Sequence, residues 1–326
     1  MNHNNPLIIN KHNFVLDRKI LLIDSDDRDI ERWPNSSEFE ITCPQIYNNV
    51  ESIRLSNIML PNFLLNISEY LQTNKMILDF SGIEHTIVIQ DGYYKHNTLK
   101  MALQKQLQKI DPSFICNFNE LNNKYYIAHS SKMFKLVLNK AIEYSNCNKV
   151  NIYSQHSEWG LGFLLGFDKL TYTSKSTTDT NILSFAHETT NWAAVSSHVL
   201  VSQNSSNLED NIFIYIDLDK YNKCDELKPY LYYNNSNTNP GIVNSAFSKI
   251  PHILSLNNNC LINDGYLENT SFFQPPIDKI AKIKIRFRYH NGMLVDFNNY
   301  NISLSLELNQ IRNEMNNYDV RTPFKI

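Results

Sequence analysis

Residues 280–308 set the strongest limit on how this chain can fold. From Ala281 to Tyr289 every second side chain is apolar, and the side chains between them are basic, namely Lys282, Lys284, Arg286 and Arg288. A period of two is typical of a β-strand with one buried and one exposed face. The same alternation returns from Ile302 to Leu308, where serine and glutamate occupy the other side.

A turn joins the first of these strands to the next. Asn291-Gly292 is the dipeptide that accepts positive φ at both centres of a two-residue type I′ turn, so we predict a hairpin whose second strand is Met293–Phe297. Strands with one apolar face are not stable alone and need a second layer to cover them. This segment therefore predicts a β-sandwich.

The rest of the chain is also dominated by short strand patterns. A second hairpin is predicted at Ser81-Gly82, and a bulge at Ser56-Asn57, where the inward side chains change from odd to even positions. One amphipathic helix is predicted, with Asn97 as N-cap and Asp111-Pro112 after its end. Its apolar stripe is Leu99, Leu103, Leu107 and Ile110. A single helix among many strands excludes a parallel α/β sheet and predicts an all-β fold.

Charge and cysteine content exclude several classes of function. The net charge of the 326 residues is -3, so no broad basic field attracts nucleic acid, and sequence-specific nucleic-acid binding is not expected. The five cysteines are scattered without a C-x-x-C pair, and no H-x-x-x-H motif occurs, so we expect no disulfide framework, metal or cofactor. No signal peptide and no apolar run of about 20 residues is found, which predicts an intracellular protein.

An acidic cluster follows the first apolar run. Asp24-Ser25-Asp26 imitates the D-x-D motif of aspartyl-phosphate phosphohydrolases, whose chemistry requires an open parallel sheet. A calcium loop is the alternative, but Arg28 takes the third ligand position. We favour a structural turn in which Asp24 or Ser25 caps backbone amides and Arg28 pairs with a carboxylate, and we therefore expect no catalytic residues.

A second suggestive cluster contains three glycines, Gly160, Gly162 and Gly166. It resembles a dinucleotide-binding fingerprint, but the third glycine comes one position late. Glycines between large apolar residues instead predict a loop that packs closely on the sandwich.

Two sets of side chains are candidates for an interface. The basic row Lys282, Lys284, Arg286 and Arg288 could meet an acidic neighbour, a lipid surface or packaged DNA, or it could be the solvated face of a sheet. Tyr230, Tyr232 and Tyr233 lie in a polar loop, where they would suit an interface or the packing of a turn.

Five motifs follow one another along the chain: Leu22-Ile-Asp-Ser-Asp-Asp-Arg28, the strand from Val50 to Asn62, Gln90-Asp-Gly-Tyr-Tyr94, Leu164-Leu-Gly-Phe167, and Ile285 to Phe297. In this order they resemble the motifs of minor capsid and penton-type proteins of nucleocytoplasmic large DNA viruses (giant viruses). In this chain Asp26 adds an acidic residue to the first motif. The resemblance implies a jelly-roll β-sandwich that is built into an icosahedral shell.

From these observations we expect an N-terminal arm at 1–19, a jelly-roll domain at 20–310 with an insertion around 113–200 and long loops, and a tail at 311–326. The expected function is that of a structural virion protein, a penton or minor capsid component assembled in the host cytoplasm. Its expected partners are the major capsid protein, other capsid proteins and further copies of itself, as a pentamer if it is a penton; nothing in the sequence supports membrane contact. The alternative is a carbohydrate-binding attachment module, because jelly rolls also serve as lectins.

Overall fold

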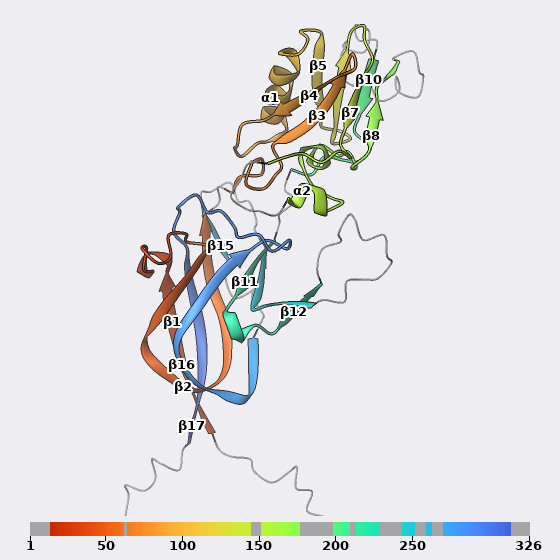
Figure 1. The fold of residues 1–326 in the computed structure, drawn as a ribbon. Helices are drawn as coiled ribbons and strands as arrows, with labels where there is room; N and C mark the ends of the chain where they lie inside the picture. Colours follow the sequence, from red (N-terminus) through yellow and green to blue (C-terminus); the bar gives the residue numbers. More distant parts are fainter. Residues whose placement is uncertain are drawn as a thin grey trace, which may run out of the picture. The chain divides into compact units, whose positions relative to one another are not determined.

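The computed structural model describes residues 14–61, 64–144, 151–176, 198–208, 213–227, 243–251, 259–262 and 270–313. They belong to two compact units (Figure 1). The first unit is drawn from residues 1–62, 213–227 and 243–326, and the second from 63–212 and 228–242. The second unit thus interrupts the sequence of the first.

The first unit is an antiparallel β-structure. Its connected sheet has the order β1-β17-β2-β16-β11-β14, and β15 pairs with β2 outside this path. A separate ribbon joins β12 to β13. The bounds of these strands are β1 Phe14–Asp24, β2 Glu38–Pro61, β11 Phe213–Asp217, β12 Cys224–Leu227, β13 Val243–Ala246, β14 Ser248–Pro251, β15 Asn259–Ile262, β16 Thr270–Arg288 and β17 Ser303–Asn313.

The two longest strands, β2 and β16, each serve two sheets, and both curve through the unit (Figure 1). The later half of β2 pairs with β17 and with the first half of β16, and β17 pairs with β1. The first half of β2 pairs with the later half of β16, which continues to β11 and β14. The strands of the two sheets can be numbered 1 to 8 along the chain if β2 and β16 count as two strands each and if β12, β13 and β15 are left out. The sheets then have the orders 1-8-3-6 and 2-7-4-5. This is the connectivity of a jelly roll, and the predicted all-β jelly-roll fold is confirmed.

Bulges produce the change of sheet. Ile280 faces Tyr47 while Lys282 faces Thr42, so extra residues of β2 bulge out between these pairs. Extra residues of β16 bulge out between Phe272, which faces Ser52, and Ile277, which faces Val50. Such bulges let one strand turn a corner between two layers. The predicted bulge at Ser56-Asn57 is confirmed, because Ser305 faces Asn57 and Leu306 faces Leu55.

The strands that carry the two ends of the described chain are longer than predicted. Residues 14–19, expected in a polar arm, belong to β1, and β17 continues past residue 310 to Asn313. The reason is that β1 and β17 pair along their full length, so that Phe14 faces Asn313 and Asp24 faces Ser303. A continuous ladder of backbone hydrogen bonds holds even polar residues in a strand.

The hairpin after β16 is present but differs from the predicted type I′ turn. The Gly292 amide donates to the Tyr289 carbonyl (3.0 Å), and the Tyr289 amide donates to the Met293 carbonyl (2.8 Å). Gly292 has φ +88°, whereas Asn291 is not among the described residues with positive φ. The loop is therefore a three-residue turn that ends in a glycine bulge. The expected strand Met293–Phe297 is reduced to an isolated bridge between Leu294 and Arg288.

The second unit contains two four-stranded antiparallel sheets, β4-β3-β7-β8 and β5-β6-β10-β9, and helix α1. The bounds are β3 Lys75–Phe80, β4 Ile83–Val88, α1 His96–Gln108, β5 Phe114–Asn119, β6 Lys124–His129, β7 Phe134–Val137, α2 Ile152–Gln155, α3 Leu161–Leu164, β8 Thr171–Thr173, β9 Lys175–Ser176 and β10 His198–Val201. The hairpin at Ser81-Gly82 is confirmed, since both residues have positive φ and Phe80 faces Ile83. One continuous core joins both sheets to α1.

Helix α1 is present as predicted, with a shifted start. Leu99, Leu103 and Leu107 are buried and Ile110 packs against the same core. The N-cap is Lys95 instead of Asn97, because the Thr98 hydroxyl accepts a hydrogen bond from the Lys95 amide (2.9 Å) and closes the first turn. Side-chain hydrogen bonds of this kind satisfy helix-start amides that have no partner within the helix.

The second unit begins at Phe63, whereas the sequence placed an insertion only around 113–200. Strands β3 and β4 and helix α1 therefore lie outside the sandwich. In sequence, β3 and β4 alternate like strands of the sandwich. Only the core that they share with β5–β7 in the structure shows that they belong to the second unit.

The glycine cluster packs closely, but against residues of the second unit and not, as expected, against the sandwich. A Cβ atom on Gly162 would lie 2.6 Å from the Leu138 side chain, and one on Gly166 would lie 2.2 Å from the Asn204 carbonyl oxygen.

Candidate functional site

The basic row of β16 is matched by a row of carboxylates. Lys282 Nζ lies 3.0 Å from Glu40 Oε1, and Lys284 Nζ lies 2.7 Å from Glu38 Oε1. The register pairs Lys284 with Glu40 and Arg286 with Glu38, so both ion pairs run diagonally between β16 and β2. Diagonal neighbours on one face of a sheet are within reach of long side chains. The charges of Lys282 and Lys284 are therefore paired within the molecule.

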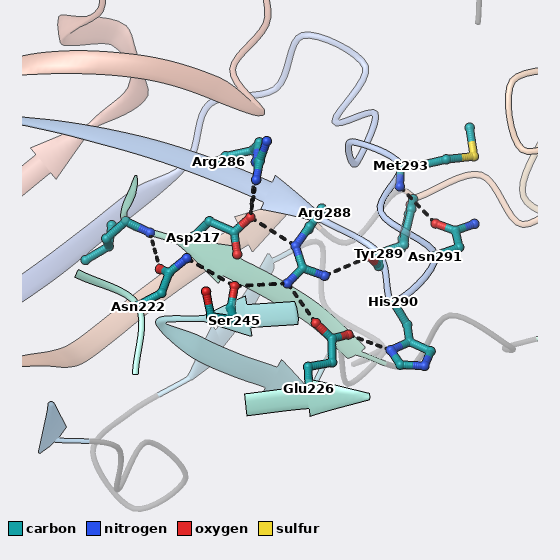
Figure 2. A network of polar contacts seen from close by, with 11 residues as sticks. Asp217, Asn222, Glu226, Ser245, Arg286, Arg288, Tyr289, His290, Asn291 and Met293 are labelled. Atoms are coloured by element: carbon teal, nitrogen blue, oxygen red, sulfur yellow. Dashed lines mark hydrogen bonds and ion pairs between the residues drawn. The ribbon is translucent and has the colours of Figure 1, made fainter. Parts of the chain in front are cut away.

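Arg288 departs from the predicted exposed row. Its side chain is 6% exposed, and it contacts Asp217 of β11 (Nε to Oδ2, 3.0 Å) and Glu226 of β12 (Nη2 to Oε2, 2.7 Å). Figure 2 shows both carboxylates around the guanidinium, with Arg286 reaching the same Asp217 oxygen. The ribbon β12–β13 brings Glu226 and the Ser245 carbonyl to this end of β16 and covers it.

The network continues to His290, whose Nδ1 lies 2.5 Å from Glu226 Oε1 (Figure 2). Burial opposes the charge of Arg288, but the hydrogen bonds and charges of Glu226 and Asp217 outweigh it and raise the pKa of the guanidinium above its ordinary value. The side chains of Asp217 and Glu226 are 4% and 6% exposed. Buried charges of this kind require their partners, so the network fastens the ribbon to the sheet.

Asp24 and Arg28 form the structural turn predicted at the acidic cluster. Asp24 Oδ1 accepts a hydrogen bond from the Asp26 amide (3.0 Å) and caps the 3₁₀ turn Ser25–Asp27. Arg28 donates to the carbonyls of Ser25 (2.6 Å) and Trp33 (3.0 Å). Among the described residues Arg28 has no carboxylate partner, in contrast to the expectation, because the chain folds back so that the carbonyls of Ser25, Trp33 and Pro34 surround the guanidinium. Gly292 and Asn291 likewise serve the turn after β16.

The apolar outer face of β1 is a feature that the sequence reasoning missed. Leu16, Ile20 and Leu22 are 54%, 54% and 74% exposed, while Leu21 and Ile23, on the other face of the strand, are buried. Within the connected sheet of the described residues, β1 is a terminal strand that pairs with β17 alone. The signal was the uninterrupted run from Ile20 to Ile23, because consecutive apolar residues in a strand make both of its faces apolar.

Charge on this face is already paired. Arg18 lies between Leu16 and Ile20, and its Nη2 is 2.7 Å from Glu307 Oε2, which Arg54 contacts at the same distance. Burial works to raise the pKa of Glu307, but its bonds to Arg54 and the charge of both arginines lower it overall. The outer face of β1 thus presents Leu16, Ile20 and Leu22 around the paired Arg18, and no other strand of the described residues pairs with the far edge of β1.

Other expected features fall outside what the structure shows. Tyr230, Tyr232 and Tyr233 lie outside the described residues. In the described part of the chain no group of three or more His, Cys, Asp or Glu side chains could hold a metal ion. The described helices include none that is long and apolar enough to cross a bilayer.

Comparisons with known proteins gave structural likenesses only. No protein-family model matches the chain, and no curated protein matches it in sequence. The mavirus penton protein aligns over 91% of this chain and 100% of its own, with 10% identity and a TM-score of 0.42. A chain from the cryo-EM structure of the Sputnik virophage aligns over 93% of this chain and 99% of its own, with 10% identity and a TM-score of 0.39.

Proposed function

We propose that this chain is a structural component of a virion that acts through contacts with neighbouring capsid subunits. The observation that carries the proposal is the outer face of β1, where Leu16, Ile20 and Leu22 are exposed on an edge strand. Soluble monomers rarely leave an apolar patch beside a free strand edge, since such an edge invites pairing with another chain. The ordered motifs between residues 22 and 297 support the same function.

The finer form of the proposal is a penton or minor capsid protein of an icosahedral large DNA virus, assembled in the host cytoplasm. Its partners would be further copies of itself, the major capsid protein and other capsid proteins. Closed symmetric assembly gives every copy the same contacts, so a single surface such as β1 would be used repeatedly. Catalysis is no part of the proposal, because Asp24 acts as a cap in its turn.

The double substitution Ile20→Lys and Leu22→Lys tests the surface. It replaces exposed apolar side chains by solvated charges, so we expect the monomer to stay folded while its association is lost. Light scattering after gel filtration measures association of the purified protein, and recovery in particles measures incorporation. Leu121→Lys, at a turn position that is 82% exposed in the second unit, is the matched control.

Unchanged association and incorporation of the double variant would show that β1 is not the contact surface. Counting this chain against the major capsid protein by quantitative mass spectrometry of purified particles then decides its place. About sixty copies, five at each vertex, identify a penton, and hundreds identify a minor capsid protein of the facets. Absence from particles would overturn the structural function.

A further inference from the structure

A hollow lies in the second unit. Its volume is about 420 Å³, and its walls include Tyr93, Tyr94, Lys95, His96 and Asn123. Small-molecule sites in proteins start at a few hundred Å³ and combine apolar surface with a few convergent polar groups. All of the lining residues come from this one unit.

Hydrogen bonds within the protein hold the walls in place. The side-chain amide of Asn66 bonds to both the amide and the carbonyl of Tyr94 (2.8 Å each) and also donates to the Leu208 carbonyl (3.3 Å). Asn123 has φ +58°, and its backbone carbonyl accepts from the Ser206 amide (2.7 Å). The hollow is therefore formed before any ligand arrives, and preorganisation of this kind lowers the entropic cost of binding.

The lining has a distinct chemistry. None of the residues that line the hollow is acidic, although the chain as a whole carries a net charge of -3. Lys95 forms no ion pair with the part of the chain that the structure describes, and its side chain is exposed. Tyr93 is 38% exposed, and the His96 ring stacks on Phe118 at 4.1 Å between centroids. The hollow thus offers a cation, aromatic surface and amide groups together.

We propose that this hollow binds a pyranose sugar that carries a carboxylate. A sugar ring has an apolar C–H face that packs on an aromatic ring, which Tyr93 supplies. Its hydroxyls need amide partners such as Asn123, whose Nδ2 donates one hydrogen bond to the Ser206 carbonyl (3.1 Å) and has a second N–H. The carboxylate pairs with Lys95 in a cavity that contains no competing acid. This proposal gives the carbohydrate-binding alternative from the sequence a specific site. It does not depend on the proposed contacts of β1.

Isothermal titration of the full chain with methyl glucuronide, methyl glucoside and acetate tests the proposal. The two glycosides share the same ring and differ in the carboxylate, so we expect the glucuronide to bind at least tenfold more tightly than the glucoside. Acetate, which lacks the ring, should not bind measurably. The affinity for the glucuronide should fall as salt is raised.

Tyr93→Ala and Lys95→Gln should each weaken binding of the glucuronide at least tenfold, while the thermal midpoint of the second unit stays unchanged. Tyr300→Ala and Lys105→Gln change an exposed tyrosine and an exposed lysine elsewhere and should have no effect. Equal affinity for both glycosides, wild-type affinity of Lys95→Gln, or no binding by the wild-type chain would each overturn the proposal. Incorporation of Lys95→Gln into particles should be normal, which separates this test from that of the virion function.

Discussion

Arg288 shows how much the environment of one residue decides its energetic role. Lys282 and Arg288 belong to the same alternating row, yet the Lys282 side chain is 56% exposed and the Arg288 side chain 6%. An exposed ion pair contributes about 0–1 kcal/mol, whereas removal of one partner from a buried pair leaves an uncompensated charge. A basic side chain can therefore contribute very different amounts to stability at two positions of one strand.

Arg288→Met should destabilise the first unit by about 3–5 kcal/mol, because Glu226 and Asp217 stay buried without this cation. Lys282→Met, in the same strand, should cost less than about 1 kcal/mol. Urea unfolding followed by circular dichroism measures both. Equal costs for the two variants would show that the network of Figure 2 does not fasten the ribbon.

Lys169 predicts a pH dependence for the second unit. Burial lowers the pKa of its amine from 10.5 to about 8, and its Nζ bonds to the carbonyls of Tyr153 and His156. Between these two values the unfolded chain holds a proton that the folded chain has released, so stability rises with pH and falls as pH drops through 8. From pH 7.5 to 9 the free energy of unfolding should rise by about 1 kcal/mol.

Lys169→Met should remove this gain, because methionine has no proton to release. The measurement is the difference between wild type and variant in urea midpoint at each pH, which cancels the titration of other groups. A constant difference from pH 7.5 to 9 would contradict the lowered pKa.

The fate of single residues was only partly predictable from the sequence. Alternation placed Lys282, Lys284 and Arg286 correctly on the outer side of β16, since it depends on strand geometry alone. It failed for Arg288, because the ribbon that covers this residue comes from residues 224–246, and pairing over such distances leaves no local pattern. For the same reason Glu38, Glu40, Asp217 and Glu226 were not foreseen as partners.

At the scale of elements, two glycine-containing turns show what a dipeptide does and does not determine. Ser81-Gly82 closes a two-residue hairpin, whereas Asn291-Gly292 belongs to a three-residue loop. Both dipeptides suit a two-residue turn, and the choice depends on the register of the strands on either side. In the second case Arg288 bridges Leu294, which adds a residue to the loop.

Substitution of glycine should separate backbone strain from steric contact. Gly82 and Gly166 have φ +81° and +92°, but a Cβ on Gly82 meets nothing within 4 Å, while one on Gly166 meets the Asn204 carbonyl at 2.2 Å. Gly82→Ala should cost about 1–2 kcal/mol for the left-handed conformation alone. Gly166→Ala should cost about 1–3 kcal/mol more, because the backbone has to move.

Thermal unfolding of both variants provides the measurement, with Gly292→Ala as a second open position in the first unit. If Gly166→Ala were no less stable than Gly82→Ala, the close approach of the α3 loop to residue 204 would not exist in solution.

At the scale of the whole molecule, the second unit has the means to fold alone. Its core runs from Ile67 to Leu208 and includes no residue of the sandwich. A chain of residues 63–212 should therefore unfold cooperatively with dispersed amide resonances in NMR spectra. A fragment without cooperative unfolding would show that the sandwich is needed to stabilise it.

The pairing of β1 with β17 has a consequence for synthesis. Strand β1 leaves the ribosome long before its partner β17, because the sequence of the second unit lies between them. At about 5–20 residues per second, β1 waits roughly 15–60 seconds with both of its edges and its apolar residues unpaired. Each nascent chain is thus most prone to associate with others before β17 has been made. Chains translated together on one mRNA are exposed to each other's β1 throughout that interval.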